Sequence, residues 1–281
     1  MSAEHPNPAA PTVPDFELLR QVGRGSYGEV WLARSVTGAW RAVKVVRRGR
    51  FDSARPYDRE FEGIRKYEPV SRSTEGLVHL LHVSQGDGFF YYVMELADDA
   101  GPADKPDHAP GKRLETPTNS SARPPISAAL YVPRTVANEL KRRGRLSFAE
   151  CVSIGIALAK GLEQLHLSGL IHRDIKPSNI IFVNGSPRLA DIGLVTDANE
   201  TRTMVGTEGY LPPDGGGTPS ADLYSFVKVC QRVTQAFGGA LLQRLQPGLP
   251  FRVGLRYRGR GSSRRRFPLP PSAQRDQSRC C

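Results

Sequence analysis

The stretch "GLIHRDIKPSNIIFVNG", residues 169–185, constrains the fold more than any other part of the chain. It places a histidine, an arginine, an aspartate, a lysine and an asparagine within eight positions, between two apolar runs. Apolar runs are expected to be buried, so the polar residues between them form a loop that is held by a packed core. Asp174, Lys176 and Asn179 are therefore candidate residues of a functional site.

A glycine-rich turn follows the first of three strands predicted in "FELLRQVGRGSYGEVWLARSVTGAWRAVKVV". Gly23, Gly25 and Gly28 have the spacing G-x-G-x-x-G, and Val30 stands two residues further on. Glycines at this spacing let backbone N–H groups approach phosphate oxygens without an intervening side chain. The same pattern also fits an ordinary tight turn, so it does not identify a site by itself.

Lys44 lies in the apolar run "RAVKVV" of the third predicted strand. A buried lysine is costly unless it is paired, so it is expected to contact a carboxylate and an anionic ligand. The following helix, predicted in "YDREFEGIRKYE", offers Glu60 and Glu62. Glu60 is preferred as the partner because Ile64 and Tyr67 then fall on the same inward side.

The loop residues have roles that fit phosphoryl transfer. Asp174 would accept the proton of an attacking hydroxyl, and Lys176 would neutralise charge on the transferred group. Asn179 and Asp191, the latter in "LADIGLV", would supply the hard oxygen ligands that Mg²⁺ prefers. Each residue alone could be an ordinary loop polar group, but their order along the chain favours a common site.

Residues 16 to about 229 resemble the eukaryotic-like (Hanks-type) serine/threonine protein kinase family, and most closely its bacterial members. The glycine-rich turn, the "RAVKVV" lysine, the helix glutamate, "HRDIKPSN", "LADIGLV" and "GTEGYLPPDG" carry the resemblance. It implies an α+β, two-lobed protein-kinase-like fold with ATP and Mg²⁺ between the lobes. The implied reaction is transfer of the γ-phosphoryl group of ATP to serine or threonine hydroxyls of a protein substrate.

The resemblance also implies roles for further residues. "YYVMEL" becomes the hinge, with Met94 as gatekeeper and with backbone groups of Glu95 and Ala97 binding adenine. Arg173 resembles the arginine that pairs with an activation-loop phosphate, which implies Thr203 as the phosphorylation site and Thr201 as second choice. The implied sets are catalytic Asp174, Lys176, Lys44 and Glu60; nucleotide-binding Val22, Gly23, Gly25, Gly28, Val30, Ala42, Lys44, Met94, Glu95 and Ala97; and metal-binding Asn179 and Asp191.

Composition shifts predict five segments. These are a disordered N-terminus (1–15), the N-lobe and hinge (16–97), a flexible insertion (98–127), a partial C-lobe that ends in the family's helix F (128–229), and a basic Arg/Pro/Gly-rich tail (230–281). In the C-lobe, Ser147 and Glu150 predict a capping box before a helix. No kinase motif follows residue 229, so the helical lobe is expected to be incomplete at its C-terminal end.

The tail carries most of the chain's charge. Eleven arginines, no lysine and one aspartate give residues 230–281 a net +10 of the total +11, which leaves the rest nearly neutral. The tail could bind RNA or acidic partners, be a plain disordered segment, or result from a reading-frame shift near residues 226–230. The frameshift hypothesis is favoured, because arginine without lysine is typical of out-of-frame translation of a GC-rich gene. Nucleic acid is therefore an unlikely partner of the main domain.

Other features narrow the class of protein. The four cysteines show no framework or metal-ligand spacing, the N-terminus lacks a secretory signal, and no run is apolar enough to span a membrane. A cytoplasmic protein is the resulting expectation. The alternative to an active protein kinase is a catalytically silent or truncated kinase-like module that binds nucleotide or a partner. A small-molecule phosphotransferase is disfavoured by "HRDIKPSN" and "GTEGY".

Overall fold

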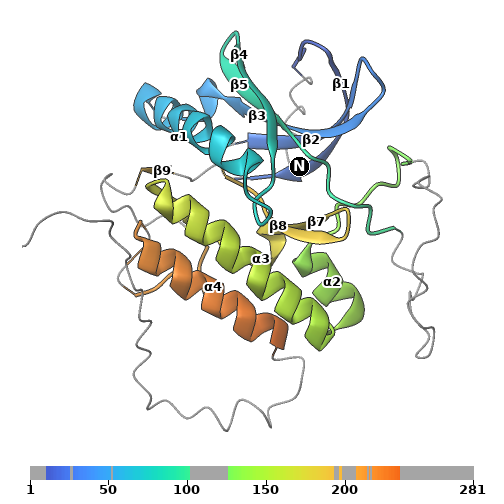
Figure 1. Ribbon diagram of the computed structural model, residues 1–281. Helices are drawn as coiled ribbons and strands as arrows, with labels where there is room; N and C mark the ends of the chain where they lie inside the picture. Colours follow the sequence, from blue (N-terminus) through green and yellow to red (C-terminus); the bar gives the residue numbers. More distant parts are fainter. Residues whose placement is uncertain are drawn as a thin grey trace, which may run out of the picture. The chain divides into compact units, whose positions relative to one another are not determined.

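A computed structural model describes most of the chain from residue 11 to residue 234 (Figure 1). All of the described residues belong to one compact unit, Met1–Gly239. Their structure is α+β, as predicted. Thr201, Thr203 and the tail from residue 235 lie outside the described residues. The described ranges are 11–25, 28–51, 53–101, 126–192, 196–197, 207–213, 215 and 217–234.

A five-stranded antiparallel sheet forms the first part of the unit. Its order is β1-β2-β3-β5-β4, and its strands are β1 (Phe16–Arg24), β2 (Gly28–Ser35), β3 (Trp40–Arg47), β4 (Leu80–Gly86) and β5 (Phe89–Met94). The three predicted strands are confirmed, and β4 and β5 form an antiparallel hairpin around Asp87. β3 is buried from Ala42 to Val46, because apolar clusters cover both of its faces. Lys44 is thus placed in the middle of a buried strand.

The helix α1 (Ala54–Arg72) follows the short 3₁₀ turn η1 (Arg48–Arg50) and lies against the sheet (Figure 1). It runs beyond the predicted span of residues 57–68, through Pro69. Proline breaks most helix interiors. Here tertiary contacts hold the last turns: the Tyr67 hydroxyl donates to the Val78 carbonyl (3.1 Å), and the Ser71 hydroxyl accepts from the Leu80 N–H (3.1 Å).

The second part is helical. Its helices are α2 (Val136–Arg143), α3 (Phe148–Leu167) and α4 (Pro219–Thr234). The Ser147/Glu150 capping box before α3 is confirmed, and α3 and α4 lie side by side (Figure 1), with the Cys151 Sγ 3.5 Å from the Val233 carbonyl oxygen. α4 continues past the predicted boundary at residue 229. No helix within the described ranges is long and apolar enough to cross a membrane.

Short elements between α3 and α4 carry the candidate catalytic residues. They are β6 (Leu170–Ile171), the 3₁₀ turn η2 (Pro177–Asn179), β7 (Ile180–Val183), β8 (Ser186–Leu189) and β9 (Thr196–Asp197). β6 pairs with β9, and β7 pairs with β8. The loop predicted between two apolar runs is therefore held between two small ladders.

The first residues of the predicted insertion are part of the ordered fold, which corrects the boundary at residue 98. The Asp98 carboxylate accepts the N–H groups of Asn184 and Gly185 (2.9 and 2.7 Å). The Ala100 N–H donates to the Val132 carbonyl (2.8 Å), and an antiparallel bridge joins Asp99 to Pro133. The two ends of the insertion are thus paired at its base, while residues 102–125 lie outside the described residues.

A close backbone approach links the sheet to α3. A Cβ built on Gly76 would lie 2.0 Å from the Ala157 carbonyl oxygen in α3. The Leu189 N–H donates to the Gly76 carbonyl (2.8 Å), and the Val78 N–H donates to the Leu189 carbonyl (2.9 Å). Only glycine leaves room for this contact, so Gly76 fixes how the segment before β4 meets α3 and β8.

Replacing Gly76 by alanine is expected to destabilise the fold by about 3 kcal/mol, because the new methyl group overlaps a backbone oxygen that cannot rotate away. Gly155→Ala is the matched control: it lies inside α3, and nothing lies within 4 Å of the position where its Cβ would stand. That variant is expected to gain up to about 1 kcal/mol from helix propensity. Urea unfolding of both variants measures the difference, and equal midpoints would contradict the packing argument.

Candidate functional site

The backbone of the loop that precedes Asp174 is held by Asp222 from α4. The buried Asp222 carboxylate accepts the N–H groups of His172 and Arg173 (2.8 Å each) and contacts the His166 Nε2 (2.9 Å). Arg173 has φ +69°, in the left-handed region that is unfavourable for a side chain with a Cβ. The two hydrogen bonds to Asp222 offset this local strain.

Asp174 is the centre of a compact polar cluster. One carboxylate oxygen, Oδ1, accepts the Thr207 hydroxyl (2.6 Å). The other, Oδ2, lies 2.7 Å from the Lys176 Nζ and accepts from the Asn179 Nδ2 (2.9 Å). Lys176 also donates to the Thr207 hydroxyl (2.8 Å). The structure thus brings together the three candidates from the opening stretch and adds Thr207.

The His172 ring holds the backbone on which this cluster is built. It is fully buried, and burial lowers its pKa although Asp222, Asp174 and Asp191 oppose that shift. A neutral ring fits its contacts, because Nδ1 faces the Asp174 N–H (3.3 Å) as an acceptor and Nε2 faces the Ala190 carbonyl (3.2 Å) as a donor. This tautomer ties the loop to the strand segment that leads to Asp191.

Lys44 pairs with Asp191, which corrects the predicted pairing with Glu60. The Lys44 Nζ donates to the Asp191 Oδ1 at 2.8 Å. Burial would lower the pKa of Lys44, but Asp191 and the other nearby groups raise it well above its usual value. Burial would likewise raise the pKa of Asp191, but Lys44 outweighs it and holds the pKa below its usual value. The pair is therefore ionised at neutral pH.

Glu60 lies on the buried face of α1, as predicted, and Glu62 lies on the exposed face. Neither carboxylate oxygen of Glu60 has a hydrogen-bond partner among the described residues. Burial raises its pKa to about 7, although Lys44 acts in the opposite direction. Lys44 forms its ion pair with Asp191 and lowers the pKa of Glu60 only in part. With a pKa of about 7, the Glu60 carboxyl group is half protonated near neutral pH.

Gly25 of the glycine-rich motif lies close to the Lys44–Asp191 pair. A Cβ built on Gly25 would lie 3.6 Å from the Asp191 Oδ2 and 3.8 Å from the Lys44 Nζ, so only a small residue leaves the space above the pair open. A Cβ on Gly28 would lie 2.6 Å from the Val45 carbonyl oxygen, which explains this glycine by strand packing. Gly25 therefore borders the site, whereas Gly28 is required by the close packing of β2 against β3.

A pocket of about 440 Å³ joins these groups. Lys44, Asp174, Lys176, Asn179 and Asp191 all line it. Gly28 and Glu60 do not line it. The remaining predicted residues that line the pocket are Val22, Gly23, Gly25, Val30, Ala42, Met94, Glu95 and Ala97.

The predicted hinge offers backbone groups to this pocket. The Glu95 N–H donates to His79, and the Ala97 carbonyl accepts the Tyr131 hydroxyl (3.0 Å). The Glu95 carbonyl and the Ala97 N–H have no hydrogen-bond partner within the described part of the chain. One acceptor and one donor are thus available two residues apart, which matches the edge of a planar heterocycle.

The sequence interpretation did not include every residue that lines or orients the site. Tyr131 and Thr135 follow the insertion, and Ile181 follows Asn179 by two residues in β7. These residues belong to no recognised sequence motif, so the sequence offered no reason to assign them to the site. Thr207 stands in the quoted "GTEGY" segment, but its two contacts with Asp174 and Lys176 depend on a fold that brings together residues about 30 positions apart.

The raised pKa of Glu60 predicts that the free energy of unfolding depends on pH. Between its usual pKa of 4.5 and its folded pKa of about 7, the folded protein holds a proton that the unfolded chain has released. The contribution of Glu60 to the free energy of unfolding is therefore greatest below pH 4.5. It falls by about 3 kcal/mol as the pH rises to 7.

The variant Glu60→Gln, which cannot titrate, is expected to lack this decline. Urea unfolding of wild type and variant at pH 5 and pH 8 measures it, with Glu62→Gln on the exposed face of α1 as the control. A wild-type-minus-variant difference that stays constant between these two pH values would show that Glu60 does not titrate in this range.

Comparison with known proteins relates this site to a family. Residues 128–227 match the protein kinase domain. The serine/threonine-protein kinase AfsK of Streptomyces coelicolor is 29% identical over 208 residues, which cover 71% of this chain and 21% of AfsK. The probable serine/threonine-protein kinase CPE1738 of Clostridium perfringens is 27% identical over 224 residues, which cover 75% of this chain and 27% of that protein.

A shorter match shows higher identity. PknK, a serine/threonine-protein kinase of Mycobacterium tuberculosis, is 34% identical over 121 residues, 40% of this chain and 11% of PknK. The chain thus spans about a quarter or less of the length of these relatives. Its resemblance to the eukaryotic-like serine/threonine protein kinases, and to bacterial members among them, is confirmed.

Proposed function

We propose that the chain is a serine/threonine protein kinase that transfers the γ-phosphoryl group of ATP to protein hydroxyls. The observation that carries the proposal is the single pocket shared by Lys44, Asp174, Lys176, Asn179 and Asp191. These residues come from β3, the loop before η2, η2 itself, and the segment after β8. Such a convergence of two cations, two carboxylates and an amide fits the positioning and charge neutralisation that phosphoryl transfer requires.

The donor set of the pocket fits ATP and Mg²⁺. The Glu95 carbonyl and the Ala97 N–H would bind the adenine edge beside Met94, while Val22, Val30 and Ala42 would contact its faces. The space that Gly25 leaves open above Lys44 would receive the phosphates. The Asp191 Oδ2 and the Asn179 Oδ1 would hold Mg²⁺, which, when bound, supplies positive charge to the phosphate oxygens.

The remaining steps follow from the contacts of Asp174. The Thr207 hydroxyl donates to the Asp174 Oδ1, so this oxygen already accepts a hydrogen bond from an alcohol. A substrate serine or threonine would present its hydroxyl proton to the same carboxylate, which acts as the base. Lys176, 2.7 Å from the Asp174 Oδ2, would neutralise charge on the transferred group. Lys44 would hold the phosphates in place.

The proposal extends to the arrangement of the chain. The sheet with α1 would form an N-lobe, and α2, α3 and α4 a C-lobe that is shorter than in the family, with the nucleotide between them. The side chain of Arg173 would pair with a phosphate on Thr203, or on Thr201 as second choice. Because the reaction consumes ATP, the proposed location is the cytoplasm.

A second candidate function is binding of nucleotide without turnover. It is favoured by the pairing of Lys44 with Asp191, which leaves the Glu60 carboxylate without a partner among the described residues. A site that transfers phosphate would need Asp191 for the metal, so Lys44 must then share it or move to Glu60. The two candidates differ in turnover and agree in nucleotide binding.

Asp174→Asn is expected to lower the rate of phosphoryl transfer by roughly a hundredfold or more, because it removes the base while keeping the shape of the side chain. Nucleotide affinity should stay near that of the wild type. Incubation of the full chain with Mg²⁺ and γ-labelled ATP, with label followed on the protein and on an added protein substrate, measures the rate. Lys44→Met should lose both transfer and binding, whereas Lys160→Met, exposed on α3 outside the pocket, should change neither.

Nucleotide binding without label in the wild type would favour the second candidate. Equal rates for wild type and Asp174→Asn would show that the label does not come from this site. Absence of both binding and transfer would overturn both candidates.

A further inference from the structure

A groove of about 730 Å³ begins beside the catalytic cluster. Lys176 and Thr207 lie at this end of the groove, and each of them contacts the Asp174 carboxylate. α2 contributes one wall, with Ala137, Leu140 and Lys141, and α4 contributes Arg232. Lys176 and Ser178 also line the nucleotide pocket, so the groove leads away from the point of the proposed transfer.

The described residues that line the groove carry charge of one sign. Among them, Lys141, Lys176 and Arg232 are charged, and none is an aspartate or a glutamate. Lys176 is paired with Asp174. Lys141 and Arg232 are exposed, and their side chains form no ion pair or hydrogen bond within the described part of the chain. Two cations without a partner among the described residues therefore line the groove, next to the proposed catalytic cluster.

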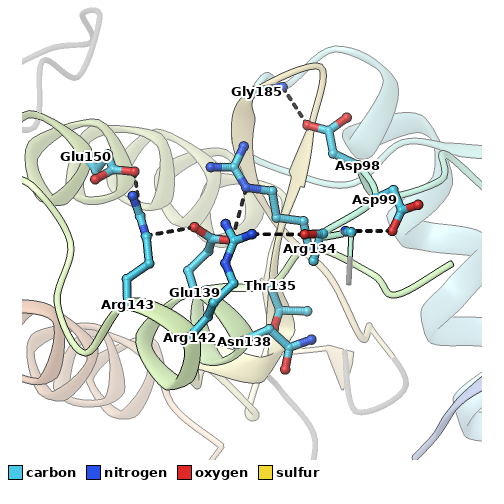
Figure 2. Close-up of polar contacts among 12 residues, drawn as sticks. Asp98, Asp99, Arg134, Thr135, Asn138, Glu139, Arg142, Arg143, Glu150 and Gly185 are labelled. Carbon is cyan, nitrogen blue, oxygen red and sulfur yellow. Dashed lines mark hydrogen bonds and ion pairs between the residues drawn. The ribbon is translucent and has the colours of Figure 1, made fainter. Parts of the chain in front are cut away.

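The neighbours of Lys141 show that α2 does compensate its other basic residues. Figure 2 shows Arg142 and Arg143 turned toward the buried Glu139. The Arg142 Nη2 lies 2.9 Å from Glu139, and the Arg143 Nε lies 3.0 Å from it. Arg143 also contacts Glu150 at 2.7 Å. Of these three consecutive basic residues, Lys141 alone has no carboxylate partner in the part of the chain that the structure describes, and it is the one that lines the groove.

We propose that this groove selects protein substrates with acidic side chains close to the phosphorylated serine or threonine. The inference rests on the proposed kinase function and names its substrate class. Carboxylates of the substrate would lie against Lys141 and Arg232, and the half-buried Leu140 and Tyr210 would contact its apolar atoms. Charge complementarity of this kind affects which partner is selected more strongly than it affects the total binding affinity. Each exposed pair is worth about a threefold to fivefold change in affinity, which salt screens.

The proposal is tested by binding, so that it does not depend on turnover. The probe is a fluorescent peptide with one serine flanked by glutamates, and the reference is the same peptide with glutamines. Fluorescence anisotropy with the full chain, Mg²⁺ and ADP is expected to show about tenfold tighter binding of the glutamate peptide at low salt. Lys141→Glu and Arg232→Glu should each weaken this preference by about threefold or more, and the double variant should abolish it.

The ten arginines that follow α4 require a matched control, because their positive charge attracts any acidic peptide. Lys160→Glu makes the same change in net charge at an exposed position of α3, outside the groove. Its preference for the glutamate peptide should stay that of the wild type. An equal loss in Lys160→Glu and Arg232→Glu, or equal affinity of the wild type for both peptides, would overturn the assignment of the groove.

A transfer assay on the same peptides separates this inference from the proposed function. Phosphorylation of both peptides at the same efficiency would keep the kinase function and overturn the acidic preference. Groove-dependent binding of the glutamate peptide without any transfer would support the groove and contradict the kinase function.

Discussion

The buried carboxylate of Asp222 is the interaction on which the site depends. It joins three elements: its own helix α4, α3 through His166, and the loop through the N–H groups of His172 and Arg173. These hydrogen bonds hold Arg173 at a φ of +69°, and the turn they stabilise aims Asp174 at Lys176 and Asn179. A buried carboxylate that lost these donors would be left without compensation, so α4 and the loop are stable only together.

The link between the five-stranded sheet with α1 and the segment around β8 does not depend on the Lys44–Asp191 pair alone. Tyr67 of α1 donates to Val78, and the backbone of Gly76 and Val78 pairs with Leu189 of β8. This connection holds α1 in place without help from Glu60. A buried carboxyl group with a raised pKa can therefore persist beside Lys44, because the surrounding backbone fixes the helix that carries it.

Local patterns predicted most of the elements that build the site. The spacing of apolar residues identified the strands before and after the glycine-rich turn, and the Ser147/Glu150 pair identified the start of α3. In the structure, the predicted catalytic, nucleotide-binding and metal-binding residues line one pocket, except for Gly28 and Glu60. The partner of Lys44 could not be predicted, because Glu60 and Asp191 are both suitable carboxylates and the choice depends on distances between segments far apart in sequence. The same holds for Gly76, whose role appears only when α3 lies against it.

The paired base of the insertion separates the length of that insertion from the geometry of the site. The chain leaves at Ala100 and returns at Val132 through a hydrogen bond between these residues, and Asp98 ties the first strand of the base to the turn after β7. The entropic cost of closing a loop grows only slowly with its length. Residues between 101 and 126 can therefore be lengthened, shortened or exchanged for a foreign domain with little effect on the hinge. In evolutionary terms, the chain can acquire a new module between the two sides of this base without a change in the residues that line its pocket.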